Sequence, residues 1–186
     1  MEKGEREFLL RYLGTSRERL IEAVDGLDLR QQRFRPAGGR WSIGDCVEHV
    51  TIVERGVLKT IQATLLEAPG KGARNRTGTP DDVILSSASL QSPRFVSPSE
   101  VRPRRRWTDF TELLRRFEAA RERSVRFAAI TQSDLRGHFF AHPNLGVLDC
   151  YQWLLFLAAH CERHAFQAAE VAADPEFPRA GHSASA

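Results

Sequence analysis

Two histidines, His160 and His164, are spaced so that they can bind one metal ion. They lie in the segment 149–171, which has no Gly or Pro and is rich in Leu and Ala, so it is expected to form an α-helix. Residues four apart lie on one face of a helix, with Cβ atoms about 5–6 Å apart, and imidazole nitrogens bind zinc at about 2.0–2.1 Å. For an isolated pair, however, two buried histidines that each make a hydrogen bond are the simpler interpretation.

A third histidine, His49, strengthens the metal interpretation. It lies in the second turn of a helix expected over residues 42–67, and catalytic metal sites typically have three protein ligands and one open position. If this helix lies beside the helix at 149–171, the imidazoles of His49, His160 and His164 can form one facial set. Nickel or zinc suits such a set, and the general affinity order of metals does not choose between them.

The segment 160–164 is not a zincin protease motif. That motif places Glu directly after the first His, whereas Cys161 stands there and Glu162 is displaced by one residue, which turns its side chain about 100° around the helix. Cys161 and Cys46 are expected to be small buried hydrophobic side chains. Asp45, Glu48 and Glu162 are expected to be solvated or ion-paired, and these carboxylates or Gln167 can orient a ligand imidazole.

Four amphipathic helices must position these residues. Each shows apolar side chains at helical spacing: 5–24, 42–67, 108–130 and 149–171. The pattern predicts an all-α fold, a four-helix bundle with a long loop at 68–106 between the second and third long helices. A turn of helix is expected before Pro36, short extended pieces at 83–85 and 94–96, and a loop at 134–146. We expect one domain over residues 1–175 and a flexible tail at 176–186.

Charge and composition argue against several classes of partner. The chain has 186 residues, a formal charge of +3 and three cysteines without a CxxC motif, which favours a cytoplasmic protein without a disulfide framework. No apolar run is long enough to span a bilayer. The basic run Arg104–Arg106 is more simply a solvated flank of the next helix than a nucleic-acid site, because no series of aromatic residues accompanies it. We therefore expect no nucleic-acid and no membrane partner.

Three motifs, taken in order, resemble one known family. They are Trp-Ser-Ile-Gly-Asp at 41–45 followed by Val-Glu-His at 47–49, then His-Pro-Asn-Leu-Gly at 142–146, then His-Cys-Glu-Arg-His at 160–164 followed by Gln167. In this order and spacing the sequence resembles the DinB-like (YfiT-like) metalloenzyme superfamily over nearly its whole length. The resemblance implies a four-helix bundle, a homodimer, and a divalent metal ion held by His49, His160 and His164.

The resemblance leaves the reaction open. The leading hypothesis, which the resemblance implies because characterised members of this superfamily include thiol transferases, is a metal-dependent enzyme that transfers a low-molecular-weight thiol to an electrophilic small molecule. The chemistry is consistent with it, since a three-histidine ion with an open position can bind a thiol as thiolate. One alternative is a metal-dependent hydrolase of small substrates at the same site. Another is a non-enzymatic binding bundle that the metal stabilises. Of the remaining histidines, His142 is expected to shape the start of the last helix, and His138 and His182 to be exposed.

Overall fold

The structure of the protein, a computed structural model, describes residues 1–68, 79–88 and 96–179. Its long helices are α1 (Lys3–Glu22), α3 (Ile43–Thr64), α5 (Phe110–Ile130) and α6 (Cys150–Ala172). The shorter elements are α2 (Leu29–Arg33), α4 (Asp81–Ser86), the 3-10 helix η2 (Ser99–Val101), and the strands β1 (Phe139–His142) and β2 (Gly146–Asp149).

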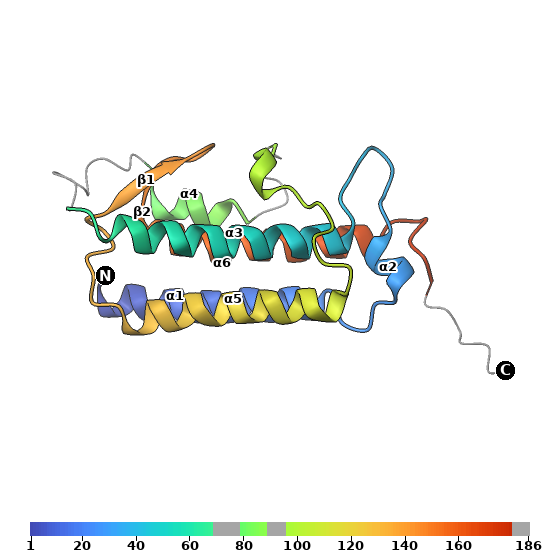
Figure 1. The fold of residues 1–186 in the computed structure, drawn as a ribbon, viewed down its shortest axis with the longest axis horizontal. Helices are drawn as coiled ribbons and strands as arrows, with labels where there is room; N and C mark the ends of the chain where they lie inside the picture. The colour runs from blue at the N-terminus through green and yellow to red at the C-terminus, as the bar shows by residue number, and fades with distance from the viewer. Residues whose placement is uncertain (69–78, 89–95, 180–186) are drawn as a thin grey trace.

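The four long helices pack as a bundle in two layers. Helices α1 and α5 form one layer, and α3 and α6 form the other (Figure 1). Helix α4, η2 and the β1–β2 hairpin lie on the outer face of the α3–α6 layer, with α4 packed on α6 and η2 on α3. The predicted four-helix bundle is therefore confirmed, and its α3–α6 layer is covered on both faces.

The starts of the long helices follow from short polar motifs. Ser42 accepts a hydrogen bond from the backbone N–H of Asp45, whose carboxylate accepts one from the Ser42 N–H. Asp149 and Gln152 form the same reciprocal pair at the start of α6. Such capping boxes satisfy N–H groups that the helix itself leaves unpaired. They fix where α3 and α6 begin, and so on which face the later histidines lie.

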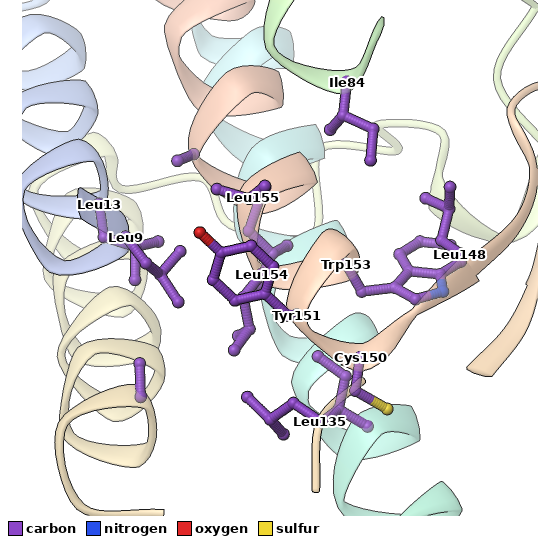
Figure 2. Close-up of a cluster of buried hydrophobic side chains, with 14 of the residues drawn as sticks. Leu9, Leu13, Ile84, Leu135, Leu148, Cys150, Tyr151, Trp153, Leu154 and Leu155 are labelled. Carbon is purple, nitrogen blue, oxygen red and sulfur yellow. The ribbon is translucent and has the colours of Figure 1, made fainter. Parts of the chain in front are cut away.

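The hydrophobic core extends to both sides of α6. Figure 2 shows Leu9 and Leu13 of α1 on one side of this helix and Ile84 and Leu148, from α4 and β2, on the other. All four side chains are fully buried. A helix covered on both faces has few polar positions, which explains why α6 is apolar around most of its circumference.

Two local predictions were wrong. Residues 83–85, expected to be extended, lie in α4. A three-residue apolar run has no period of its own, and Pro80 followed by two Asp residues begins a helix. The segment 134–146, expected to be a loop, contributes to the antiparallel β1–β2 hairpin. Strands of four residues that pair only with each other leave little pattern in a sequence. The extended piece expected at 94–96 falls mostly outside the described residues.

One arginine holds the elements around the start of α6 together. The guanidinium of Arg136 forms ion pairs with Glu5 of α1, Asp81 of α4 and Asp149, the N-cap of α6. It also lies over the ring of Tyr151, 4.1 Å from the ring centroid. These contacts hold α4 against the bundle although the segment that precedes it in sequence is long.

The last described residues contact the short helix α2. The rings of Phe34 and Phe177 pack edge to face, and Gln31 donates a hydrogen bond to the carbonyl of Pro178. Residues 180–186, including His182, lie outside the described part of the chain. No helix among residues 1–68, 79–88 and 96–179 is both long enough and apolar enough to cross a membrane.

Candidate metal centre

The three histidines singled out from the sequence meet between α3 and α6. The Nε2 atom of His160 lies 3.0 Å from Nε2 of His49 and 3.2 Å from Nε2 of His164. Among the described residues, these three offer nitrogen atoms that all lie within 4.8 Å of one another. The structure thus brings together the ligand set that the sequence predicted, on the face of the α3–α6 layer that η2 covers rather than in the centre of the bundle.

A backbone carbonyl sets the tautomer of His49. Its Nδ1 lies 2.8 Å from the carbonyl oxygen of Val101 in η2. A carbonyl can only accept, so Nδ1 carries the proton and Nε2 presents its lone pair to the other two rings. This arrangement, a ring nitrogen facing the site and the opposite N–H held by a protein oxygen, is usual for histidines that bind metals.

Burial keeps all three imidazoles neutral. Desolvation lowers the pKa of His49, which the hydrogen bond to Val101 partly offsets. Burial lowers the pKa of His160 and His164 well below the usual value, and the neighbouring histidines lower them further. Neutral imidazole is the form that binds metals, so the site has the right protonation state at neutral pH.

The geometry fits a divalent cation. Ligands at about 2.0–2.1 Å from a tetrahedral zinc lie about 3.3–3.4 Å apart, close to the two Nε2 distances of 3.0 and 3.2 Å. The Nε2 of His160 faces two other nitrogens, and one N–H can donate to only one of them. A cation at this point satisfies all three nitrogens at once, so the residues present fit a metal ion.

Aromatic rings form the walls of the site. The indole of Trp41 stacks on His164 and lies against His49, with ring centroids 5.9 and 4.8 Å apart. The ring of Phe156 lies against His160, at 5.1 Å between centroids. His49 and His164 are buried, whereas His160 remains partly exposed. His160 is therefore the least buried of the three histidines.

The fourth histidine near the site, His142, closes the turn of the hairpin. Its Nδ1 accepts hydrogen bonds from the backbone N–H groups of Asn144 and Leu145, both at 3.1 Å. Its ring packs on Phe156 and Trp153, and burial lowers its pKa to about 4. His142 thus shapes the segment that leads into α6, as the sequence indicated, and it stands outside the group of three converging histidines.

The carboxylates near the ligands are ion-paired and buried. Asp45 pairs with Arg35, Glu162 with Arg19, and Glu48 with Arg106. Each is less than a tenth exposed, so of the two states expected from the sequence, solvated or ion-paired, the structure shows the ion-paired one. The group that orients His49 is instead the carbonyl of Val101. Sequence reasoning missed it, because any residue supplies a carbonyl.

The remaining candidates lie as follows. Cys46 and Cys161 are fully buried, as expected. Burial lowers the pKa of His164, and the nearby Gln167 side chain offsets a small part of this effect. The Nδ1 of that histidine is buried without a hydrogen-bond partner of good geometry. The prediction that His138 is exposed was wrong. It is 7% exposed, and its ring bridges the carbonyls of Asp134 and Glu67 at 2.7 and 3.1 Å, a contact between distant segments that sequence spacing cannot indicate.

Comparisons with known proteins agree with this architecture. A family model described as the DinB superfamily matches residues 12–168. The uncharacterized protein YuaE of Bacillus subtilis (strain 168) is 22% identical over 149 residues, covering 80% of this chain and 87% of YuaE. The solved structure of YfiT from Bacillus subtilis, described as a probable metal-dependent hydrolase with an unusual four-helix bundle topology, matches with a TM-score of 0.61 and 14% identity over 93% of this chain and 89% of YfiT. The likeness to YfiT shows the fold, and the match of the family model over most of the sequence shows that this chain belongs to the DinB superfamily.

Proposed function

We propose that this chain is a metal-dependent enzyme in which His49, His160 and His164 hold a divalent ion. The observation that carries the proposal is the convergence of three neutral imidazoles on one point, with His160 the least buried of the three. A divalent ion bound there supplies a Lewis acid that lowers the pKa of a coordinated thiol or water. Zinc or nickel suits this donor set.

The nucleophile in this proposal comes from outside the protein. Burial raises the pKa of the Cys150 thiol to about 12 and that of Cys161 to about 11, and it also raises the pKa of Cys46. The thiolate is the reactive form of cysteine, so none of these side chains supplies one at neutral pH. The protein's part is to bind the ion, orient the substrate against the aromatic walls and limit the access of water.

Transfer of a small thiol is the reaction that these surroundings support best. The three carboxylates near the ligands are buried in ion pairs, so none of them is placed as a general base for water. A thiol, with a pKa of about 8.5, needs far less help to ionise than water. In the transfer, the thiol sulfur forms a bond to an electrophilic carbon, the leaving group departs with its electron pair, and the thiol proton passes to solvent.

Hydrolysis of small substrates is the second candidate, and the likeness to YfiT, described as a probable metal-dependent hydrolase, favours it. The two can be separated with zinc- and nickel-loaded protein. We expect turnover of 1-chloro-2,4-dinitrobenzene with cysteine or another small thiol, and little turnover of p-nitrophenyl esters. Ester hydrolysis without thiol-dependent transfer would instead support the hydrolase. Both activities should be lost in His160→Ala.

The metal assignment has its own test. Titration of the metal-free protein with Zn²⁺ is expected to show one site per chain. Replacing His160 and His164 together by Ala should abolish Zn²⁺ binding, and stoichiometric binding of Zn²⁺ by that variant would overturn the assignment. A homodimer, also part of the proposal, is checked by light scattering after gel filtration.

A further inference from the structure

The segment 99–106, which we call the strap, crosses α3 beside His49 and carries the carbonyl that bonds to it. The sequence shows this segment only as a basic run, and the proposed function assigns it no role. Because Val101 in the strap accepts the Nδ1–H of His49 at 2.8 Å, anything that holds the strap also holds the tautomer and the position of this ring.

One carboxylate oxygen on α3 holds the strap. Oε1 of Glu48 accepts hydrogen bonds from the backbone N–H of Arg104 at 3.0 Å and from that of Arg106 at 3.2 Å. The guanidinium of Arg106 approaches the same oxygen at 3.5 Å. Glu48 is 2% exposed, and charge-assisted hydrogen bonds in such surroundings are strong. The residue directly before His49 in sequence is therefore the anchor of the segment that orients it.

The backbone of the strap is shaped for this contact. Arg105, between the two donors, has φ of +55°, in the left-handed region that is unfavourable for a residue with a Cβ. A turn of this kind aims neighbouring N–H groups at one anion. Such backbone strain persists only where the surroundings compensate for it, and here the carboxylate of Glu48 supplies the compensation.

The arginine side chains stiffen the strap itself. Arg102 donates to the carbonyl of Ser97 at 2.8 Å, and Arg104 to that of Ser99 at 3.2 Å. Arg106 reaches the carbonyls of Arg102 and Glu100 at 3.4 and 3.3 Å. These guanidinium groups thus bond to backbone oxygens of the strap or of Ser97 just before it, which gives the arginines a structural role beside the metal site.

We propose that Glu48 is a positioning residue of the metal centre, which acts through the strap to hold His49 with its Nδ1–H on Val101 and its Nε2 toward the ion. The inference rests on the proposed function for the ion, but the strap and the tautomer are properties of the metal-free chain. Partners of metal-binding histidines typically account for 10–100-fold in metal affinity, and an effect of this size is expected here.

The sharpest test changes only the backbone of the strap. Arg105→Gly and Arg105→Pro remove the same side chain, but glycine accepts a positive φ readily whereas proline is confined to about −65°. In Zn²⁺ titrations, Arg105→Gly should bind as the wild type does, and Arg105→Pro should bind 10–100-fold more weakly. Equal affinity in the two variants overturns the proposal.

A second pair of variants tests the carboxylate. Glu48→Ala should weaken Zn²⁺ binding 10–100-fold, and Glu48→Gln should recover part of this loss because an amide oxygen still accepts N–H bonds. The matched control is Glu100→Ala, a carboxylate in the same strap that is exposed and accepts a bond from Ser99. It should leave the affinity unchanged. Wild-type affinity in Glu48→Ala counts against the proposal.

A readout without metal separates this inference from the proposed function. In ¹⁵N NMR spectra of the metal-free protein, His49 should be the Nδ1–H tautomer in the wild type and in Arg105→Gly. It should become a mixture of tautomers in Arg105→Pro and Glu48→Ala. If the wild type binds no metal but the tautomer follows the strap variants, the proposed function fails and the strap inference stands. If the tautomer of His49 is the same in all of these variants, the inference is overturned even if the protein binds metal.

Discussion

Arg121 in α5 donates a hydrogen bond to Oε2 of Glu54 in α3 at 3.0 Å, and neither side chain is more than 1% exposed. The same guanidinium donates to the carbonyl of Leu13 and the hydroxyl of Ser16 in α1, and to the carbonyl of Leu157 in α6. Arg121 thus bonds to each of the other three long helices. This contact lies inside the bundle, whereas the metal centre lies on the outer face of the α3–α6 layer.

Replacing Glu54 by Leu is expected to destabilise the fold by about 3–5 kcal/mol, because it leaves the buried charge of Arg121 without its partner. Urea unfolding followed by circular dichroism measures this loss. The double replacement Glu54→Leu with Arg121→Met should recover most of the stability, because removing both charges avoids their desolvation. If the free energy of unfolding of Glu54→Leu alone lies within about 1 kcal/mol of the wild-type value, the ion pair contributes little to stability.

Saturating Zn²⁺ is expected to stabilise the protein. Binding to the native state alone adds about 2.7 kcal/mol when the free ion is at 100 times its dissociation constant, which corresponds to a rise of roughly 5–10 °C in the melting temperature of a chain this size. Differential scanning fluorimetry with and without EDTA measures the shift. His164→Ala should show no shift with zinc, and a shift of full size in that variant would place the ion elsewhere.

Acid should destabilise the metal-free protein before its carboxylates titrate. Burial lowers the pKa of His142 to about 4, so between pH 6.5 and about 4 the unfolded chain binds a proton there that the native chain does not. The free energy of unfolding therefore falls as pH falls through this window, by up to about 1.4 kcal/mol per pH unit for this group. Above pH 6.5 the contribution of His142 to the pH dependence vanishes.

The contribution of His142 can be isolated with His142→Asn, since Asn keeps an acceptor for the N–H groups of Asn144 and Leu145. Unfolding free energies of both proteins should be measured from pH 4.5 to 8. The slope below pH 6.5 should be smaller in the variant, and parallel curves would contradict the buried neutral state of this ring.

The three cysteines should react slowly with thiol reagents in the native protein. All are buried, and burial raises the pKa of each, so little thiolate is present or accessible. Ellman's reagent at pH 8 should titrate close to none in the native protein and all three in 6 M guanidinium chloride. One thiol that reacts rapidly in the native protein would identify a nucleophile within the chain and weaken the proposal of an external thiol.

Much of the bundle and the shared face of His160 and His164 could be predicted from sequence, because both rest on local rules, whereas His49 was a candidate only because it lies in the body of another predicted helix. Spacing of i and i+4 places His160 and His164 on one face whatever surrounds the helix. Capping residues such as Ser42 and Asp149 mark where helices begin. The periodic apolar residues of the long helices require a common core, and bundles satisfy that requirement with few topologies.

Tertiary structure alone decided what surrounds those histidines. It placed His49 beside His160, 111 residues away, on the outer face of the α3–α6 layer rather than inside the bundle. It placed the carbonyl of Val101 against His49 and the carboxylate of Glu48 against the backbone N–H groups of the strap. It also buried His138. The physical reason is that backbone carbonyls and N–H groups occur at nearly every position, so their pairing over long sequence distances depends on how the helices pack, which short-range residue patterns do not encode.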